Sequence, residues 1–231
     1  MSDFTLYYWP IPFRGQFVRA VLAHVSASWN EADMEALSLL MRAEPTMQLV
    51  PHMGPPVLTD HATDLSLAQT PAILAYLGGK YALIPDDPLR AALTTKIIAD
   101  ANDVLCEMTL HNGSQMWTSE RWDDYCPRLV RWMTIFEEHG RRYGLTAQLG
   151  YVLGTNLPSL ADLVVYTLWG VMTSKLPALR PVLETAAPSI AALSDRIHQL
   201  PEQEELRVRS DAEYGSEWCS GQIEASLRAV L

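Results

Sequence analysis

The sequence predicts a small α/β domain, ordered βαβ-ββα, followed by an all-helical domain. Short β-prone runs alternate with helical apolar stripes only in the first eighty residues. A proline-bearing acidic connector, KYALIPDDP, comes next, and the apolar segments beyond it have helical spacing. We therefore expect an α/β domain over residues 1–80, a linker over 81–88 and a helical domain over 89–231.

The elements of the first domain follow from local patterns. Phe4 to Tyr8 is a compact β-prone run whose alternation places Phe4, Leu6 and Tyr8 on one face, and FVRAVLAHV (17–25) carries a helical stripe. QTPAILAYLGG (69–79) predicts a helix that ends at its two glycines, as a C-cap does. Three further strands are expected, the last two as a hairpin, over residues 28–34, 55–60 and 64–68.

The second domain is predicted as helices packed on helices. The segment SLAD, Ser159 to Asp162, is typical of a capping box, with Asp in place of the usual Glu or Gln. We expect helices over residues 89–109, 127–143, 159–174, 188–200 and 201–208.

Composition and charge disfavour several classes of protein. The net charge of −10 argues against nucleic acid or anionic membrane as a partner. The longest apolar stretch, residues 163–172, is about half of the roughly 20 residues that a membrane span needs. Three scattered cysteines without CxxC or histidine company predict neither a disulfide framework nor a metal site. Since the N-terminus also lacks the pattern of a secretory signal, a cytoplasmic location is expected.

Three motifs in order resemble the cytosolic glutathione transferases: PPVL (55–58), LAQTPAILAYL (67–77) and NLPSLADLVV (156–165). The resemblance covers essentially the whole chain. It implies a thioredoxin-like domain before a glutathione-transferase helical domain, glutathione as co-substrate, a small hydrophobic electrophile as second substrate, no metal, and a homodimer. Tyrosine-type members are the most similar, and no class is assigned.

Glutathione contacts are expected near Pro56 and at the start of the third helix. Unpaired N–H groups at a helix start favour a carboxylate, and the resemblance gives Gln69 and Thr70 the γ-glutamyl end. It also makes Pro56 a cis-proline whose preceding residue pairs with the cysteinyl unit. Here that residue is Pro55, which has no N–H, so one of two hydrogen bonds is lost at a cost of about 0.5–1.5 kcal/mol.

The catalytic residue implied by the resemblance is Tyr8, with Tyr7 as alternate. A thiol of pKa about 8.5 must drop by roughly two units to ionise at neutral pH, and one hydrogen bond to the anion supplies about 1.5–3 kcal/mol. The loop up to Arg14-Gly15 is two residues longer than in Tyr-Trp members. An ungapped match to the serine and cysteine types would place Ile11 or Phe13 at the reactive position, and neither can donate.

Other candidate residues have a structural reading beside the functional one. Arg14 is a candidate glutathione contact or a surface ion pair, and Asp103 either reaches across the dimer to the γ-glutamyl amine or belongs to a solvated acidic face. Core packing competes with a substrate role for the apolar candidates, and for Trp218 the two cannot be separated. The predicted electrophile pocket consists of Trp9, Ile11, Phe13, Met116 and Trp117.

The leading functional hypothesis is an enzyme that binds glutathione, stabilises its thiolate and conjugates it to hydrophobic electrophiles. The alternative is a weakly catalytic or non-catalytic binding protein of the same fold, favoured by Pro55 and the longer loop. A further alternative is a glutathione-dependent isomerase, dehalogenase or peroxidase, in which the same thiolate does different work.

Overall fold

A computed structural model of the chain describes residues 2–231. Its sheet has four strands in the order β2-β1-β3-β4, with β1 parallel to β2 and antiparallel to β3. The strands are β1 (Phe4–Tyr7), β2 (Trp29–Glu31), β3 (Val57–Asp60) and β4 (Leu65–Ala68). β3 and β4 form the expected hairpin. The mixed sheet followed by helices confirms the predicted fold class.

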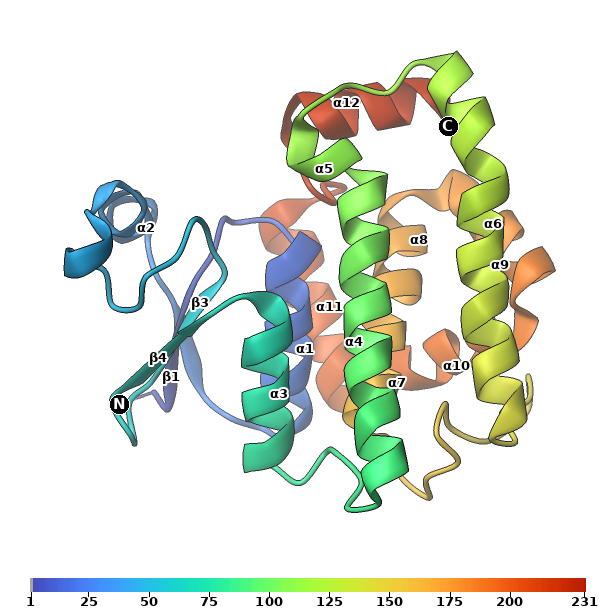
Figure 1. Cartoon of the computed structure of the whole chain (residues 1–231), viewed down its shortest axis with the longest axis horizontal. Coiled ribbons are helices and arrows are strands. Elements are labelled where there is room, and N and C mark those ends of the chain that lie inside the picture. Colours follow the sequence, from blue (N-terminus) through green and yellow to red (C-terminus); the bar gives the residue numbers. More distant parts are fainter. Residues whose placement is uncertain (1) are drawn as a thin grey trace.

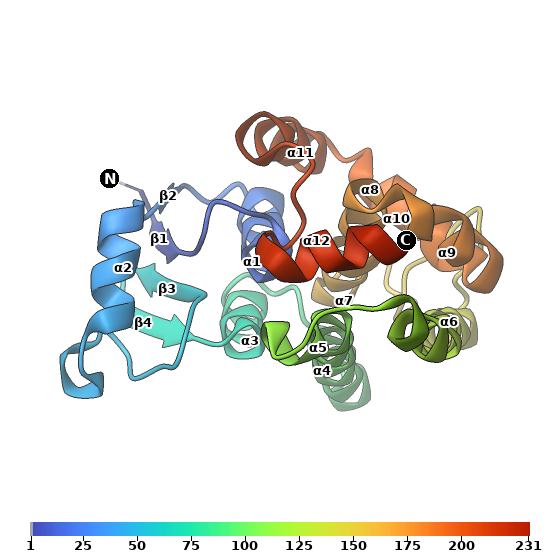
Figure 2. The ribbon, with the colours of Figure 1, turned by 90° about the horizontal axis from the view of Figure 1, so that it is seen from above.

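Helices cover both faces of the sheet. α1 (Phe13–His24) and α3 (Thr70–Lys80) lie between the sheet and the remaining helices, whereas α2 (Met34–Arg42) lies on the outer side (Figure 2). Asp33 caps α2 by accepting a hydrogen bond from the backbone N–H of Ala36, and a single 3₁₀ turn follows at Pro45–Met47. Phe4 and Leu6 are fully buried because they face α1 and α3, as the alternation of the strand predicts.

The rest of the chain is helical (Figure 1). Two long helices, α4 (Pro88–Met108) and α6 (Ser119–Arg142), stand beside a run in which α7 (Leu160–Val165) continues through the π-helical Tyr166–Val171 into α8 (Met172–Lys175). The other elements are α5 (Leu110–Gly113), a 3₁₀ turn (Pro177–Leu179), α9 (Arg180–Ala186), α10 (Pro188–His198), α11 (Pro201–Tyr214) and α12 (Gly221–Val230).

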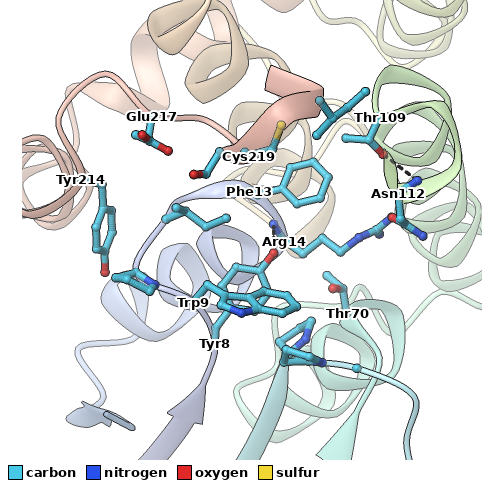
Figure 3. Close-up of a pocket in the computed structure, with 18 of the residues that line it drawn as sticks. Tyr8, Trp9, Phe13, Arg14, Thr70, Thr109, Asn112, Tyr214, Glu217 and Cys219 are labelled. Atoms are coloured by element: carbon cyan, nitrogen blue, oxygen red, sulfur yellow. Dashed lines mark hydrogen bonds between the residues drawn. The ribbon is translucent and has the colours of Figure 1, made fainter. Parts of the chain in front are cut away.

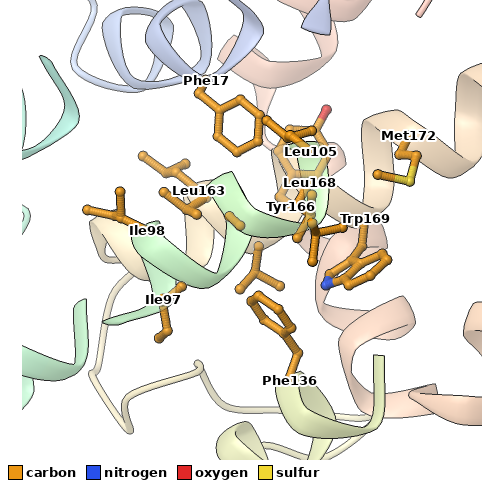
Figure 4. Packing of buried hydrophobic residues seen from close by; sticks show 14 of the residues in the cluster. Phe17, Ile97, Ile98, Leu105, Phe136, Leu163, Tyr166, Leu168, Trp169 and Met172 are labelled. Atoms are coloured by element: carbon orange, nitrogen blue, oxygen red, sulfur yellow. The ribbon is translucent and has the colours of Figure 1, made fainter. Parts of the chain in front are cut away.

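One apolar core joins the two parts of the chain. Phe17 points from α1 into the same core as Leu163 and Leu168 from the central helices and Phe136 from α6 (Figure 4). The start of α7 is fixed as predicted, because the buried Asp162 carboxylate accepts hydrogen bonds from the backbone N–H and the hydroxyl of Ser159, at 2.8 and 2.6 Å.

The structure differs from several of the predicted boundaries. α3 does not end at its glycines but continues to Lys80, since Gly78 is a packing position whose Cβ would lie 2.6 Å from Leu160. α6 begins at Ser119, not Pro127, because Thr118 caps it and the proline lies inside the helix. The first strand ends at Tyr7, and α2, α5, α9 and α12 were not predicted. No helix among residues 2–231 has the length and apolar character needed to span a membrane.

Candidate functional site

A cleft of about 1050 Å³ opens where the α/β part meets the helices. Five segments form its walls: the loop after β1 with the start of α1, the segment before β3, the start of α3, the junction of α4 and α5, and the chain between α11 and α12 (Figure 3). The cleft brings together nine residues predicted from the sequence: Tyr8, Trp9, Ile11, Phe13, Arg14, Pro55, Pro56, Gln69 and Thr70.

The Tyr8 side chain is buried against the start of α1 and faces the cleft. Its hydroxyl oxygen accepts a hydrogen bond from the backbone N–H of Arg14 at 3.1 Å, which satisfies one of the free N–H groups of the first helical turn. Burial raises the pKa of Tyr8 well above its usual value, so the phenol keeps its proton. No acceptor among residues 2–231 takes that proton, which leaves the hydroxyl free to donate to a ligand. Tyr7 instead pairs with Val57 in the sheet and does not line the cleft.

Gly15 allows the Tyr8 ring to lie against α1. A Cβ atom at this position would stand 2.3 Å from Cδ1 of Tyr8, which is closer than real side chains approach. The ring is held on another side by the Trp9 indole, edge-on at 5.3 Å between ring centroids. The position of the Tyr8 hydroxyl therefore depends on residue 15 being a glycine, which has no side chain.

The two arginines of α1 do different work. Arg14 crosses the cleft wall and donates to the side-chain oxygens of Asn102, at 2.5 Å, and Asn112, at 3.1 Å. Arg19 is almost fully buried and forms a two-point ion pair with Glu31 at 2.8 and 3.0 Å. Its remaining donors bind the backbone carbonyls of Ile11 and Trp9, so Arg19 fixes the shape of the loop after β1.

The start of α3 offers unpaired donors to the cleft. Gln69 immediately precedes the helix with a left-handed φ of 73°. The buried hydroxyl of Thr70, the first helical residue, has no hydrogen-bond partner in the part of the chain that the structure describes. A buried polar atom without a partner costs free energy, and a helix N-terminus attracts negative charge. Both features suit a ligand carboxylate at this end of the cleft.

The segment before β3 places two prolines on the cleft wall. The Pro55–Pro56 peptide bond is cis, as expected from the sequence. Both prolines line the cleft. Because Pro55 has no N–H, this position can only accept a hydrogen bond from a ligand through its carbonyl oxygen.

Comparison with known proteins decides the family. A family model described as Glutathione S-transferase, C-terminal domain, matches residues 93–230, more than half of the chain. The chain belongs to the glutathione S-transferase family. No curated protein sequence matches it significantly.

Solved structures of glutathione S-transferases share the fold across most of the chain. The structure of NaGST-2 covers 90% of this chain and 97% of its own, with a TM-score of 0.70 and 18% identity. The Pi-class glutathione S-transferase of Onchocerca volvulus covers 91% and 94%, with a TM-score of 0.71 and 18% identity. At this identity the two structures establish the shared fold.

Besides Tyr7, three of the predicted site residues lie outside the cleft of this glutathione S-transferase family member. Trp117 is buried beside Trp122 and Tyr125, and its indole N–H donates to the Met108 carbonyl at 3.0 Å, so it packs in the helical core. Met116 and the exposed Asp103 are also absent from the cleft wall. For Trp117 the core-packing reading fits the structure. A role for Asp103 at a partner's cleft stays a prediction.

Some cleft residues were not predicted. Cys106, Thr109 and Asn112 come from the α4–α5 junction, and Cys219 and Ile223 from the chain around the start of α12. That C-terminal wall is held by Glu224, whose carboxylate accepts from three successive backbone N–H groups, those of residues 218–220. These segments are far from residues 4–80 in sequence, and no local motif marks them. Trp218 itself is buried, with its ring edge-on to Phe13 at 5.1 Å.

Proposed function

We propose that the chain is a glutathione transferase in which the Tyr8 hydroxyl stabilises the glutathione thiolate for attack on a hydrophobic electrophile. The observation that carries the proposal is the free phenolic proton of Tyr8. The oxygen already accepts from the backbone N–H of Arg14, so the hydroxyl is oriented, and its proton has no acceptor in the described residues.

The walls of the cleft suit the two ends of glutathione and an apolar partner. The γ-glutamyl carboxylate would bind at Gln69 and Thr70, and this is supported by the α3 N-terminus and the unpaired hydroxyl that lie there. The cysteinyl unit would donate its N–H to the Pro55 carbonyl. Trp9, Ile11 and Phe13 then form the apolar wall for the electrophile. We further propose a cytoplasmic homodimer in which Asp103 faces the partner's cleft.

The chemistry requires only ionisation and positioning. The thiol loses its proton to solvent, the Tyr8 hydroxyl donates a hydrogen bond to the resulting thiolate, and the sulfur forms a bond to the electrophilic carbon as its leaving group departs. A hydrogen bond to a charged group contributes about 1.5–3 kcal/mol, enough to lower a thiol pKa by roughly one to two units. Holding both reactants in one cleft supplies the remaining acceleration.

Replacement of Tyr8 tests this function. Tyr8→Phe keeps the ring and removes the donor, so the pKa of bound glutathione should rise by about one to two units and kcat/KM should fall by about tenfold to a hundredfold. The measurements are a pH titration of thiolate absorbance in the complex and steady-state conjugation rates. Tyr7→Phe is the matched control, because Tyr7 lies in the sheet. A thiolate that survives Tyr8→Phe unchanged contradicts the proposal.

The second candidate function is a binding protein with little turnover, and Pro55 favours it. The missing N–H removes one hydrogen bond to the cysteinyl unit, a loss of up to about tenfold in affinity. Calorimetric titration with glutathione separates the two functions. Tight binding with an ordinary thiol pKa and no conjugation supports the binding protein, whereas a lowered thiol pKa with turnover supports the transferase.

A further inference from the structure

We propose that Asn102 and Asn112 are positioning residues that hold Arg14 beside Tyr8 as a cation without a counter-ion, so that its charge lowers the pKa of the bound thiol. This inference rests on the proposed function, because it assigns the electrostatic part of the same thiolate site. The Tyr8 hydrogen bond is one contribution to the stability of the thiolate, and the charge of Arg14 is a second.

The geometry around Arg14 is an arginine fork held by amides. Nη1 donates to Oδ1 of Asn102 on α4, and Nη2 donates to Oδ1 of Asn112 on α5. The backbone N–H of the same arginine holds the Tyr8 hydroxyl oxygen. Arg14 therefore connects the thiolate donor to the helical wall of the cleft, with its guanidinium fixed at two points.

Arg14 differs from the two buried cations of the described residues, Arg19 and Lys175, in the chemistry of its acceptors. Arg19 pairs with Glu31 and Lys175 with Asp211, each within 2.8 Å. Arg14 makes no ion pair with any carboxylate of residues 2–231. An amide oxygen orients a guanidinium through its dipole but cancels none of its charge.

The titratable groups that share this cleft do not neutralise Arg14. The Tyr8 phenol, whose pKa is raised by burial, keeps its proton and carries no charge. The Cys106 thiol lies 3.5 Å from Nδ1 of His111 on α5. From another wall come the half-buried Cys219 thiol and the exposed carboxylates of Glu213 and Glu217, and neither carboxylate forms an ion pair with Arg14.

The backbone that carries Asn112 is strained toward this contact. Leu110, His111 and Asn112 have left-handed φ angles of 44°, 57° and 58°. Such angles cost free energy for residues other than glycine and persist where the surroundings over-determine them. Two hydrogen bonds hold Asn112 in this conformation. Its backbone N–H donates to the Thr109 hydroxyl at 3.2 Å, and its side-chain oxygen accepts from Arg14. Asparagine is also among the residues that tolerate this conformation best.

The consequence for the thiol follows from Coulomb's law. A positive charge within a few ångströms of a thiol favours the thiolate, and a carboxylate bound to that cation would cancel most of the effect. With amide acceptors the full charge of Arg14 acts on an anion beside Tyr8. The pKa of the bound thiol should then depend on the charge of residue 102, through its contact with Arg14.

The decisive variant is Asn102→Asp, which is nearly isosteric and keeps the acceptor oxygen. It converts the contact into an ion pair, so the pKa of bound glutathione should rise by about one unit relative to wild type. The readout is the pH titration of thiolate absorbance at saturating glutathione. Asn156→Asp is the control, because it makes the same chemical change at an exposed position outside the cleft and should leave the thiol pKa unchanged.

A second variant separates positioning from stability. Asn112→Gly removes the amide at a position whose φ glycine adopts freely, so the thermal midpoint should not fall while the thiol pKa rises. If wild type shows a lowered thiol pKa that Asn102→Asp leaves unchanged, this inference is wrong and the transferase proposal stands. If wild type binds glutathione with an ordinary thiol pKa, both are wrong.

Discussion

Gly15 determines where the Tyr8 ring lies, because only a residue without a side chain leaves room for the ring against α1. The Tyr8 ring occupies the volume that a Cβ on α1 would fill, and the hydroxyl thereby reaches the Arg14 N–H. The sequence suggested the functional importance of Arg14-Gly15 only through resemblance to known transferases. The physical reason, a ring packed on a helix start, requires the relative position of two elements that no local pattern specifies.

We predict that Gly15→Ala reduces catalysis without a comparable loss of fold. The added methyl must displace the Tyr8 ring, so the hydroxyl moves from the thiolate position and kcat/KM should fall by about tenfold or more, the equivalent of roughly one hydrogen bond to a charge. Conjugation rates and the thiol pKa are the measurements, with circular dichroism as a check on the fold. Activity equal to wild type would show that the ring position is not critical.

The sequence placed Tyr8, Thr70 and the cis-proline at the cleft because each lies in a segment with a local signature, and the roles of Tyr8 and Thr70 stay predictions. Tyr8 directly follows a strand, Thr70 opens a helix and Pro56 precedes a strand. Prediction from sequence did not find Asn112, whose contribution arises from a left-handed turn and a contact to Arg14 across 98 positions of sequence. Trp117 was misassigned because a tryptophan near a helix end fits core packing and pocket lining equally well.

At the scale of the element, α3 shows where a helical pattern can mislead. Its apolar stripe and its start were predicted, but the pair Gly78-Gly79 was interpreted as a stop signal. The first glycine is required by the close approach of α7 and the second is exposed inside the helix. Tertiary contact with Leu160, which lies about eighty residues further on, determines the role of Gly78 and cannot be read locally.

The two glycines of α3 make a matched pair for mutation. Gly78→Ala should destabilise the protein by about 1–3 kcal/mol, because its Cβ would collide with Leu160 and Ile84. Gly79→Ala meets nothing within 4 Å and should stabilise it by about 0.5–1 kcal/mol through helix propensity. Denaturant unfolding measures both. Equal effects at the two positions would contradict the packing argument.

The whole molecule has one continuous apolar core although its sequence divides into two regions of different character. Side chains from β1, α1 and α3 belong to the same buried cluster as those of α4, α6 and α7. The change of pattern after residue 80 correctly predicted an α/β part followed by a helical part. It could not show that the α/β part and the helices share their core. The apolar side chains that meet there form ordinary stripes on each side, and such stripes do not show which surface they pack against.

We predict that the chain unfolds as a single cooperative unit. Phe17→Ala removes a buried α1 side chain that packs into the helical core, and should cost about 3–5 kcal/mol, lowering one common thermal midpoint by roughly 10 °C. Scanning calorimetry, with agreement between calorimetric and van't Hoff enthalpies, is the measurement. Val208→Ala, at an exposed position on α11, should change little. The prediction would be contradicted by two separate unfolding transitions of which Phe17→Ala shifts only one.

The clamp formed by Arg19 has a practical consequence for redesign. Its guanidinium ties the main chain at Trp9 and Ile11 to Glu31, so the loop keeps its course whatever side chain Ile11 carries. A library of substitutions at Ile11 should therefore alter electrophile preference without loosening the backbone. Since the loop needs little ordering when a ligand arrives, differences between such variants should report contacts at the apolar wall rather than the entropy of loop closure.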